Sequence, residues 1–299
     1  MQVILARHVV PVIETSQRLS DYLCGVFVQL PSRKSVKTAI KKGAVMIEGK
    51  KGHTGDWVKS HQEIQLIDLD KAPTKILKMP MEVLYEDAYL AVVFKPAGIP
   101  VSGNQFRTVE NALLYNIQPS TALDALKQPR AAHRLDAPTS GLLLIAKTKQ
   151  ARISLGAQFE AKTIEKRYQA IVLGVPAPKG EIKEPIEGKK SWSVYERLQT
   201  VDSLKSGQLS LLNLYPKTGR THQLRIHLSK FGFPILGDAL YGKEGLILKH
   251  KGLFLTAIEL KFKHPISGKA QEIVLPTPYK YEALLEREQR RFDRYNSSV

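Results

Sequence analysis

The strongest constraint on the fold is a series of strand-like segments in the part of the chain that follows residue 80. Runs of apolar and β-favouring residues cover 167–173, 192–198, 208–215, 253–262 and 272–275, with short connections between several of them. The segments do not alternate with helices, and the glycine fingerprint of dinucleotide-binding folds is missing, which excludes a doubly wound parallel sheet. The sequence therefore predicts an α+β domain built on a largely antiparallel mixed sheet flanked by helices.

The chain is expected to divide into two domains, residues 1–75 and 76–299. Residues 71–75 (KAPTK) have the composition of a short linker, and patterned sequence resumes after them. In the first part, helices are predicted over 16–26 and 32–42, followed by a strand at 44–47 and a partner strand at 64–67. The first domain is thus expected to be a small α+β domain.

The charge balance points to a polyanionic partner. Lys and Arg total 45 against 28 Asp and Glu, a net charge of +17. Residues 33–51 alone carry seven Lys and Arg and a single acidic residue, Glu48. A run of charge is often only a solvated helix face, but this imbalance favours contact with phosphates. Nucleic acid is predicted ahead of an anionic membrane surface.

The single cysteine, Cys24, excludes a disulfide framework and every multi-cysteine metal site. No stretch approaches the roughly 20 apolar residues that cross a bilayer, and no cleavable signal pattern is present. His222 and His227 are five residues apart, so on a helix they point in different directions and are not expected to share a metal. We therefore predict a cytoplasmic protein with no metal and no membrane contact.

The first segment that could carry chemistry is 133–141 (HRLDAPTSG), directly before the apolar run 142–146. Its proline and glycine force a turn, so Asp136 is expected on a loop held by a buried strand. Rigidly anchored loops commonly carry catalytic groups. Asp136 could instead be a turn-forming aspartate, but the nearby Arg134 and Thr139 favour a functional cluster.

The second segment is 217–228 (KTGRTHQLRIHL), where a helix is predicted with Thr221 as its N-cap and a stop at Gly232. Its buried stripe is predicted to be Leu224, Leu228 and Phe231. Arg225 falls early in this helix, where the dipole prefers anions. Its position suggests a specific anionic partner, a phosphate or a carboxylate, with an exposed surface arginine as the alternative.

A third candidate is Tyr168, on the strand that begins near residue 167. A lone tyrosine there is ordinarily core or rim. It becomes functional if its face meets Asp136 and Arg225, because an aromatic ring can stack on an extruded base.

These segments resemble a known family. Residues 133–147 (HRLDAPTSGLLLIAK) resemble the catalytic signature of the RluA-type pseudouridine synthases. Residues 219–228 (GRTHQLRIHL), together with 234–238 (PILGD) and 241–242 (YG), resemble that family's later motif. Residues 85–98 and 264–268 are similar to its opening segment and closing hairpin. The resemblance covers nearly all of residues 80–280. It implies isomerisation of uridine to pseudouridine in structured RNA, ribosomal RNA ahead of transfer RNA, without a cofactor or metal. A monomer is the default expectation for the oligomeric state.

The resemblance also implies roles for individual residues. Asp136 would be the nucleophile, Tyr168 would pack on the target base, and Arg225 would partner the aspartate. Arg134 would fill the space left by the flipped nucleotide. The remaining substrate contacts would be His133, Thr139, Arg220, His222 and Gln223. Segments 105–130 and 176–190 are expected to be loops that help to choose the substrate.

Residues 1–75 resemble an S4-type RNA-binding domain, with matches at 18–19, 32–33, 43–45 and 47–49. Where such domains carry a Gly–Asp turn before the last strand, this chain has 60–63 (SHQE). The RNA-binding residues implied are Arg18, Arg33, Lys34, Lys37, Lys41 and Lys42.

Two rival functions are compatible with the same residues. One is a non-catalytic RNA-binding or ribosome-assembly protein that keeps the fold. The other is a hydrolase in which Asp136 works with a second carboxylate. The reaction product separates the three.

Overall fold

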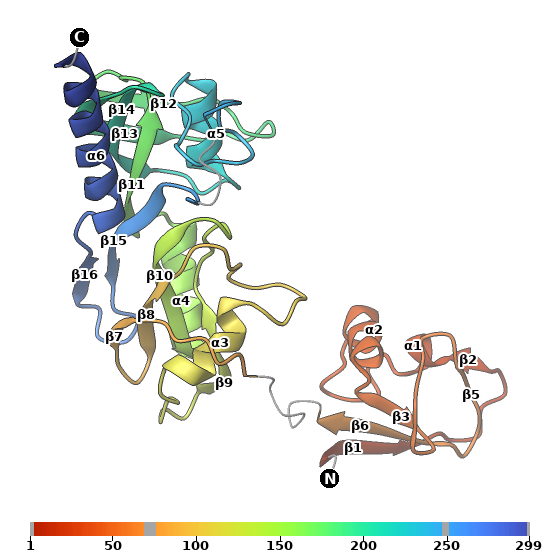
Figure 1. Cartoon of the computed structure of the whole chain (residues 1–299). Helices are drawn as coiled ribbons and strands as arrows, with labels where there is room; N and C mark the ends of the chain where they lie inside the picture. The colour runs from red at the N-terminus through yellow and green to blue at the C-terminus, as the bar shows by residue number, and fades with distance from the viewer. Residues whose placement is uncertain (1–2, 69–75, 247–250, 298–299) are drawn as a thin grey trace. The chain divides into compact units, whose positions relative to one another are not determined.

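The computed structural model describes residues 3–68, 76–246 and 251–297. The chain forms two compact units, Met1–Lys75 and Ile76–Val299 (Figure 1). The predicted linker at 71–75 lies outside the described residues. Among the helices of the described residues, none has the length and apolar character needed to cross a bilayer.

The N-terminal unit is a four-stranded antiparallel sheet covered by helices. Its strand order is β1 (Val3–Val9), β6 (Glu63–Asp68), β3 (Val45–Ile47) and β4 (Lys50–Lys51). The two-stranded ribbon β2 (Gln17–Arg18) and β5 (Trp57–Val58) adjoins α1 (Leu19–Tyr22). The apolar side of α2 (Arg33–Lys42) packs into the core of this unit.

Local sequence explains where α2 begins and ends. Ser32 accepts a hydrogen bond from the Ser35 amide, the Ser35 hydroxyl accepts one from the Ser32 amide, and Gly43 ends the helix in the left-handed region. These bounds confirm the helix predicted for 32–42. The helix predicted for 16–26 is much shorter, because the chain turns after Tyr22 and Gly25 takes a positive φ of 81°.

The turn before β6 forms without the Gly–Asp pair. His61 takes the left-handed conformation, with φ 68°, and its amide donates to the carbonyl of Val10. The Lys59 amide donates to the Gln62 side chain across the same turn. A histidine thus occupies a backbone conformation for which glycine is the usual residue.

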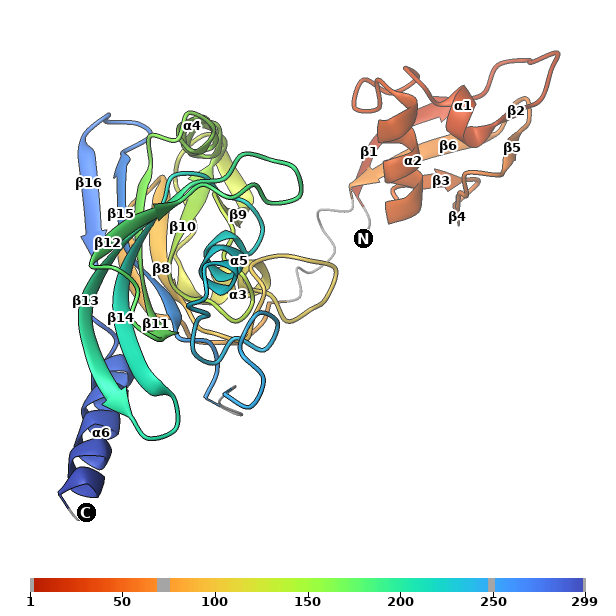
Figure 2. The ribbon, with the colours of Figure 1, turned by 90° about the horizontal axis from the view of Figure 1, so that it is seen from above.

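The C-terminal unit is built on one ten-stranded sheet (Figures 1 and 2). Its main path runs β12 (Lys179–Ile182), β13 (Ser193–Ser203), β14 (Gly207–Pro216), β11 (Glu165–Leu173), β15 (Leu255–Lys263), β10 (Ser140–Thr148), β8 (Leu90–Lys95) and β7 (Val83–Glu86). Off this path, β16 (Ala270–Val274) pairs with β15, and β9 (Ala125–Ala131) pairs with β10. The α-helices are α3 (Val109–Asn116), α4 (Lys149–Glu160), α5 (Gln223–Lys230) and α6 (Tyr279–Asn296). This confirms the largely antiparallel α+β sheet flanked by helices.

The one parallel pair among the described strands joins β10 to β15. In it, Ser140 pairs with Thr256 and Gly141 pairs with Ala257. Gly141 has a φ of 113°, and a Cβ there would lie 2.1 Å from the carbonyl oxygen of Ala257. Only glycine allows this approach. Side chains reinforce the pair, because the Thr256 hydroxyl bonds both Ser140 and the buried Tyr281 of α6. The loop that precedes β10 is thereby anchored beside the centre of the sheet.

Several elements were not predicted. The segments 105–130 and 176–190, expected to be loops, contain α3, β9 and β12. Pro129 lies inside β9 and lowers its strand propensity, and β9 has only β10 as a partner. Phe231, predicted in the buried stripe of α5, is 46% exposed, whereas Leu224 and Leu228 are buried. The helix ends at Lys230, so Phe231 lies at its C-cap.

Candidate active site

A cavity of about 730 Å³ lies in the C-terminal unit, where the loop before β10 faces the start of β11 and the loop between β14 and α5. Its walls include every site residue that the sequence predicted in this unit: Asp136, Arg225, Tyr168, Arg134, His133, Thr139, Arg220, His222 and Gln223. A second cavity of about 570 Å³ also has Asp136 and Arg225 in its wall. The Asp136 carboxyl is 16% exposed and lies where the two cavities meet.

The buried Lys95 holds the Asp136 loop in place through hydrogen bonds to the loop's backbone carbonyls. The Thr139 amide closes the turn by donating to the Asp136 carbonyl at 3.0 Å. Lys95, at the end of β8, is fully buried, and its Nζ donates to the carbonyls of Ala137 and Thr139 at 3.1 and 2.7 Å. Burial lowers the pKa of Lys95 to about 8, and the Asp136 charge opposes that shift. Sequence reasoning missed Lys95, although a lysine ending an apolar strand was a usable signal.

Arg225 connects Asp136 to a second carboxylate. One of its terminal nitrogens lies 3.4 Å from Asp136 Oδ2, and the guanidinium binds Asp238 in a bidentate pair at 2.7 and 2.8 Å. Arg225 is 3% exposed and the Asp238 side chain is fully buried. The predicted contact between Arg225 and Asp136 is present, but the stronger bonds go to Asp238, which the sequence reasoning did not include in the site.

Asp238 accepts hydrogen bonds from Arg225 and from two backbone amides. Its burial would raise the pKa, but hydrogen bonds from Arg225 and from the Leu240 and Tyr241 amides hold the pKa below its ordinary value. Asp238 therefore stays ionised, and it fixes the plane of the guanidinium that faces Asp136. The signal for it was a lone acid after the apolar residues of the segment 234–238.

His222 lies on the other side of Asp136. The prediction of Thr221 as N-cap is wrong: α5 begins after His222, which has a φ of 54° and makes no side-chain capping bond. Its Nδ1 is 2.9 Å from the Tyr241 hydroxyl and its Nε2 is 3.8 Å from Asp136. The Arg225 guanidinium also lies 5.0 Å from the centre of the Tyr241 ring. Tyr241, also missed, therefore supports both groups that flank the carboxylate.

Sheet register brings Tyr168 to the same place. Ala257 of β15 pairs with Tyr168 of β11 on one side and with Gly141 of β10 on the other. Tyr168 is partly buried in the cavity wall, and burial together with the charge of Asp136 raises the pKa of its hydroxyl. The ring therefore stays uncharged and offers an aromatic surface beside Asp136.

The other predicted contacts divide into two kinds. Gln223 is buried, and its side chain bonds Ser193, the Trp192 carbonyl, Thr218 and the Arg220 amide, so it shapes the loop between β14 and α5. Thr139 is buried behind Asp136. Arg134 and Arg220 are exposed, which makes the mouth of the cavity basic.

His133 faces β10. The Leu144 amide donates to its Nε2 at 3.1 Å, and its ring lies 4.9 Å from that of Phe159. Burial, with a smaller contribution from the Lys166 charge, lowers the pKa of His133 from 6.5 to about 3. Because Nε2 must accept the hydrogen bond, the imidazole is neutral and carries its proton on Nδ1.

This arrangement predicts a loss of stability in mild acid. Between pH 6.5 and pH 3 the unfolded chain binds a proton at position 133 that the folded chain does not, so the free energy of unfolding falls as pH falls. We expect a contribution of about 1 kcal/mol between pH 7 and pH 5, below the full linkage value because the ring is partly exposed. Urea unfolding of His133→Gln at both pH values should show a shallower dependence than the wild type. If the free energy of unfolding of His133→Gln depends on pH as strongly as that of the wild type, the buried neutral state of His133 is wrong. It is also wrong if the exposed-histidine control His53→Gln weakens the pH dependence by the same amount.

Among the described residues, no three His, Cys, Asp or Glu side chains form a group that could hold a metal ion. The cavity wall presents the Asp136 carboxylate, an arginine fixed by Asp238, and the Tyr168 ring. Such a set can bind a polar planar group and attack an electrophilic carbon.

Comparison with known proteins identifies the family. The family model for RNA pseudouridylate synthase matches residues 89–230. An uncharacterized RNA pseudouridine synthase of Chloroflexus aurantiacus is 37% identical over 95% of this chain and 93% of its own length. Ribosomal large subunit pseudouridine synthase D of Pseudomonas aeruginosa is 34% identical over 90% of this chain and 91% of its own length.

Solved structures agree with the sequence comparison. Human RNA Pseudouridylate Synthase Domain Containing 1 superimposes with a TM-score of 0.55 at 26% identity, covering 67% of this chain and 84% of that chain. The fold and the similarity along nearly the whole sequence lead to one conclusion. The chain belongs to the RNA pseudouridine synthase family of enzymes.

Proposed function

We propose that this enzyme isomerises specific uridines in structured ribosomal RNA, and that Asp136 is the nucleophile that acts on a nucleotide flipped into the cavity. The observation that carries the proposal is the row of ionic contacts Asp136–Arg225–Asp238, in which Asp136 and Arg225 line a cavity that also has Tyr168 in its wall. A volume of about 730 Å³ suits a small ligand such as a single nucleotide. Ribosomal RNA is the expected substrate because relatives that align over most of the chain carry that substrate in their names.

The reaction makes defined demands on the site. The bond between C1′ and N1 breaks, the uracil turns, a bond forms between C1′ and C5, and the proton on C5 is lost while N1 gains one. A carboxylate can attack the sugar or the ring and later leave, so Asp136 suits either route. Arg225 places a guanidinium 3.4 Å from that carboxylate, and Tyr168 offers a face on which the uracil can lie.

Reaching the cavity requires the target to leave its stack. Unstacking and unpairing a nucleotide costs roughly a few kcal/mol. Arg134 and Arg220 at the mouth can offset part of that cost by binding the flanking phosphates. Arg134, on the same loop as Asp136, is the side chain best placed to occupy the vacated stack.

The experiment that tests the function is a map of pseudouridines in total RNA from cells with and without the gene. We expect one or more positions in large-subunit ribosomal RNA to revert to uridine. Unchanged ribosomal RNA with lost sites in transfer RNA would overturn the substrate. Free uracil or cleaved RNA as the main product in vitro would favour the hydrolase. The map identifies the RNAs whose pseudouridines require this protein. If the pure protein binds these RNAs but forms no pseudouridine in them, the non-catalytic binder is favoured.

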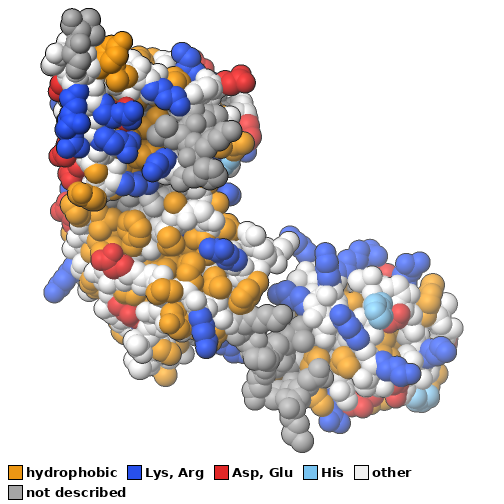
Figure 3. Space-filling view, viewed as in Figure 1, with side chains coloured by type: hydrophobic (Ala, Val, Ile, Leu, Met, Phe, Trp, Pro, Cys, Tyr) orange, Lys and Arg blue, Asp and Glu red, His pale blue; other side chains and the backbone are white. Residues whose placement is uncertain are grey.

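We infer that the N-terminal unit is an S4-like RNA-binding domain. On α2, Lys34, Lys37 and Lys41 share one exposed face opposite the buried Val36 and Ile40. Figure 3 shows Lys and Arg side chains gathered over this region. Arg18 and Lys42 are also exposed, whereas Arg33 is held by Asp21 at 2.6 Å and is less available to phosphate.

This inference predicts that Lys37→Glu weakens RNA binding about tenfold at low salt, because a phosphate contact becomes a repulsion. Turnover at saturating RNA should not change. The matched control is Lys59→Glu, an exposed lysine that follows β5. Equal losses in the two variants, measured by fluorescence anisotropy with a labelled hairpin RNA, would mean that α2 has no special role.

A further inference from the structure

The C-terminal helix α6 separates its side chains into three faces. Tyr281, Leu284 and Leu285 are buried against the sheet. Glu282, Glu286 and Asp293 recur at i, i+4 and i+11 and form an acidic face. The remaining face carries four exposed arginines: Arg287, Arg290, Arg291 and Arg294. Their spacing of i, i+3, i+4 and i+7 places all four on one side of the helix.

This separation is not what helix stability favours. Arg287 and Arg291, and likewise Arg290 and Arg294, are like charges at i,i+4, and each such pair costs about 0.2–0.5 kcal/mol. The helix dipole favours cations only within the last turn, so it accounts for Arg294 but not for Arg287 or Arg290. Within the helix, Glu288 forms ion pairs with two of the arginines. Its carboxylate oxygen lies 3.4 Å from a guanidinium nitrogen of Arg287 and 3.9 Å from one of Arg291.

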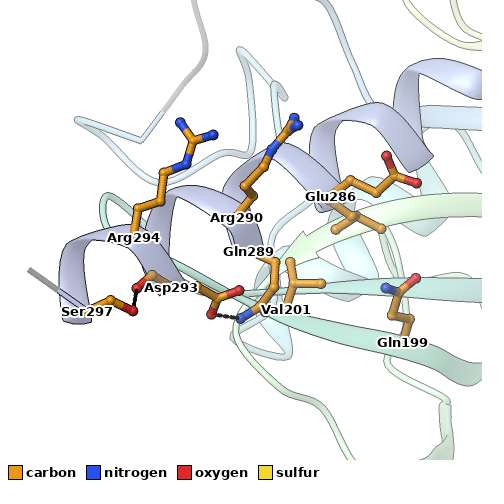
Figure 4. Close-up of a pocket in the computed structure, with 9 residues that line it drawn as sticks. Gln199, Val201, Glu286, Gln289, Arg290, Asp293, Arg294 and Ser297 are labelled. Carbon is orange, nitrogen blue, oxygen red and sulfur yellow. Dashed lines mark hydrogen bonds between the residues drawn. The ribbon is translucent and has the colours of Figure 1, made fainter.

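The arginine face borders a groove. This groove of about 720 Å³ lies between α6 and β13, and its lining has mixed charge, since Arg290 and Arg294 contribute to it together with Glu286 and Asp293. Figure 4 shows Arg290 and Arg294 extending from one side of α6, while Gln289 and Asp293 extend from the other toward Val201. Arg290 and Arg294 therefore extend from the side of α6 opposite Asp293, and Figure 3 shows Lys and Arg side chains gathered over the α6 region.

The arginine face is far from the cavity. Ser193, at the start of β13, bonds Gln223 and His227 at the cavity side of the sheet. Gln289 accepts from the Asp202 amide near the other end of β13. At about 3.3 Å per residue, these two ends are about 30 Å apart.

We propose that this face of α6 is a second RNA-binding surface, which holds the phosphate backbone of a helical segment remote from the target uridine. Arginine is well suited to phosphate because its planar fork donates two parallel hydrogen bonds. This proposal rests on the proposed function, because it takes the partner of α6 to be the same RNA that the enzyme modifies. It predicts a preference for large folded RNA, since only such a substrate reaches both surfaces.

The test is the double variant Arg290→Gln/Arg291→Gln in the full-length protein. The matched control is Lys179→Gln/Lys269→Gln, which removes the same charge from exposed positions of the same unit outside α6. The probe is a labelled fragment of large-subunit ribosomal RNA that contains a mapped site and its flanking helices. We expect the dissociation constant to rise about five- to tenfold, and the slope of log K against log salt to fall by about 1 to 2, with kcat unchanged.

A salt slope equal to that of the control variant would overturn the proposal. A fall in kcat at saturating RNA would also overturn it, because it would place α6 in catalysis rather than in binding. The outcome is separable from the proposed function. If RNA binding depends on the arginines but the protein forms no pseudouridine, the proposed function alone is wrong. If turnover is normal and the salt slope of the double variant is unchanged, this proposal alone is wrong.

Discussion

Asp136→Asn should abolish pseudouridine formation, with a loss of at least about a thousandfold in kcat, while the protein folds and binds RNA as before. Asparagine keeps the shape of the side chain but has no anionic oxygen with which to attack a carbon. The carboxyl is only partly buried, and its charged contacts are Arg225 at 3.4 Å and His222 Nε2 at 3.8 Å, so the substitution leaves few groups unpaired. Tritium release from RNA labelled at C5 of uridine measures the loss directly.

The matched control for this variant is Glu282→Gln, which neutralises an exposed acid on the first turn of α6. It should turn over at the wild-type rate. If Asp136→Asn retains even a tenth of the wild-type tritium release, the nucleophile is another group and the proposed mechanism is wrong. A loss of RNA binding equal to the loss of turnover would instead make Asp136 a binding residue.

Arg225→Met should have the largest effect on stability, lowering the free energy of unfolding by about 3–5 kcal/mol. The reason is Asp238, whose carboxylate would remain fully buried with only two backbone amides as donors. Turnover should fall as well, because the fixed cation beside Asp136 is lost. Urea unfolding and RNA binding, measured on the same protein, separate the two effects, and binding should survive far better than turnover.

A double variant sharpens this prediction. Arg225→Met/Asp238→Asn removes the buried charge and keeps an oxygen for the Leu240 and Tyr241 amides, so it should recover part of the stability but none of the activity. Arg152→Met, an exposed arginine on α4, should change stability by less than about 0.5 kcal/mol. An Arg225→Met protein as stable as the wild type would show that the ion pair with Asp238 contributes nothing to the fold.

The sequence predicted those parts of the fold that depend on local pattern. The apolar strand after the Asp136 loop and the helix over 32–42 both form as predicted. The elements that were missed have weak local signals. The strand β9 contains a proline, and α6 begins without a side-chain cap and is buried along one face only.

The site was predicted less evenly, for a physical reason. Asp136, Tyr168 and Arg225 lie in long motifs, and register in the sheet brings them together. Lys95, Asp238 and Tyr241 act on the site only through other groups: one holds carbonyls, one holds a guanidinium, and one holds an imidazole. Such support depends on which backbone atoms and side chains meet in three dimensions, so the local signals at Lys95 and Asp238 did not by themselves assign these residues to the site.

The short parallel seam between β10 and β15 has a mechanical consequence. Two residue pairs form that ladder, and it is where the two halves of the sheet meet. One wall of the reaction chamber stands on each half, with Asp136 on the β10 side and Arg225 on the side of β14 and α5. A twist at this joint would change the width of the cavity while the longer ladders on both sides stay intact.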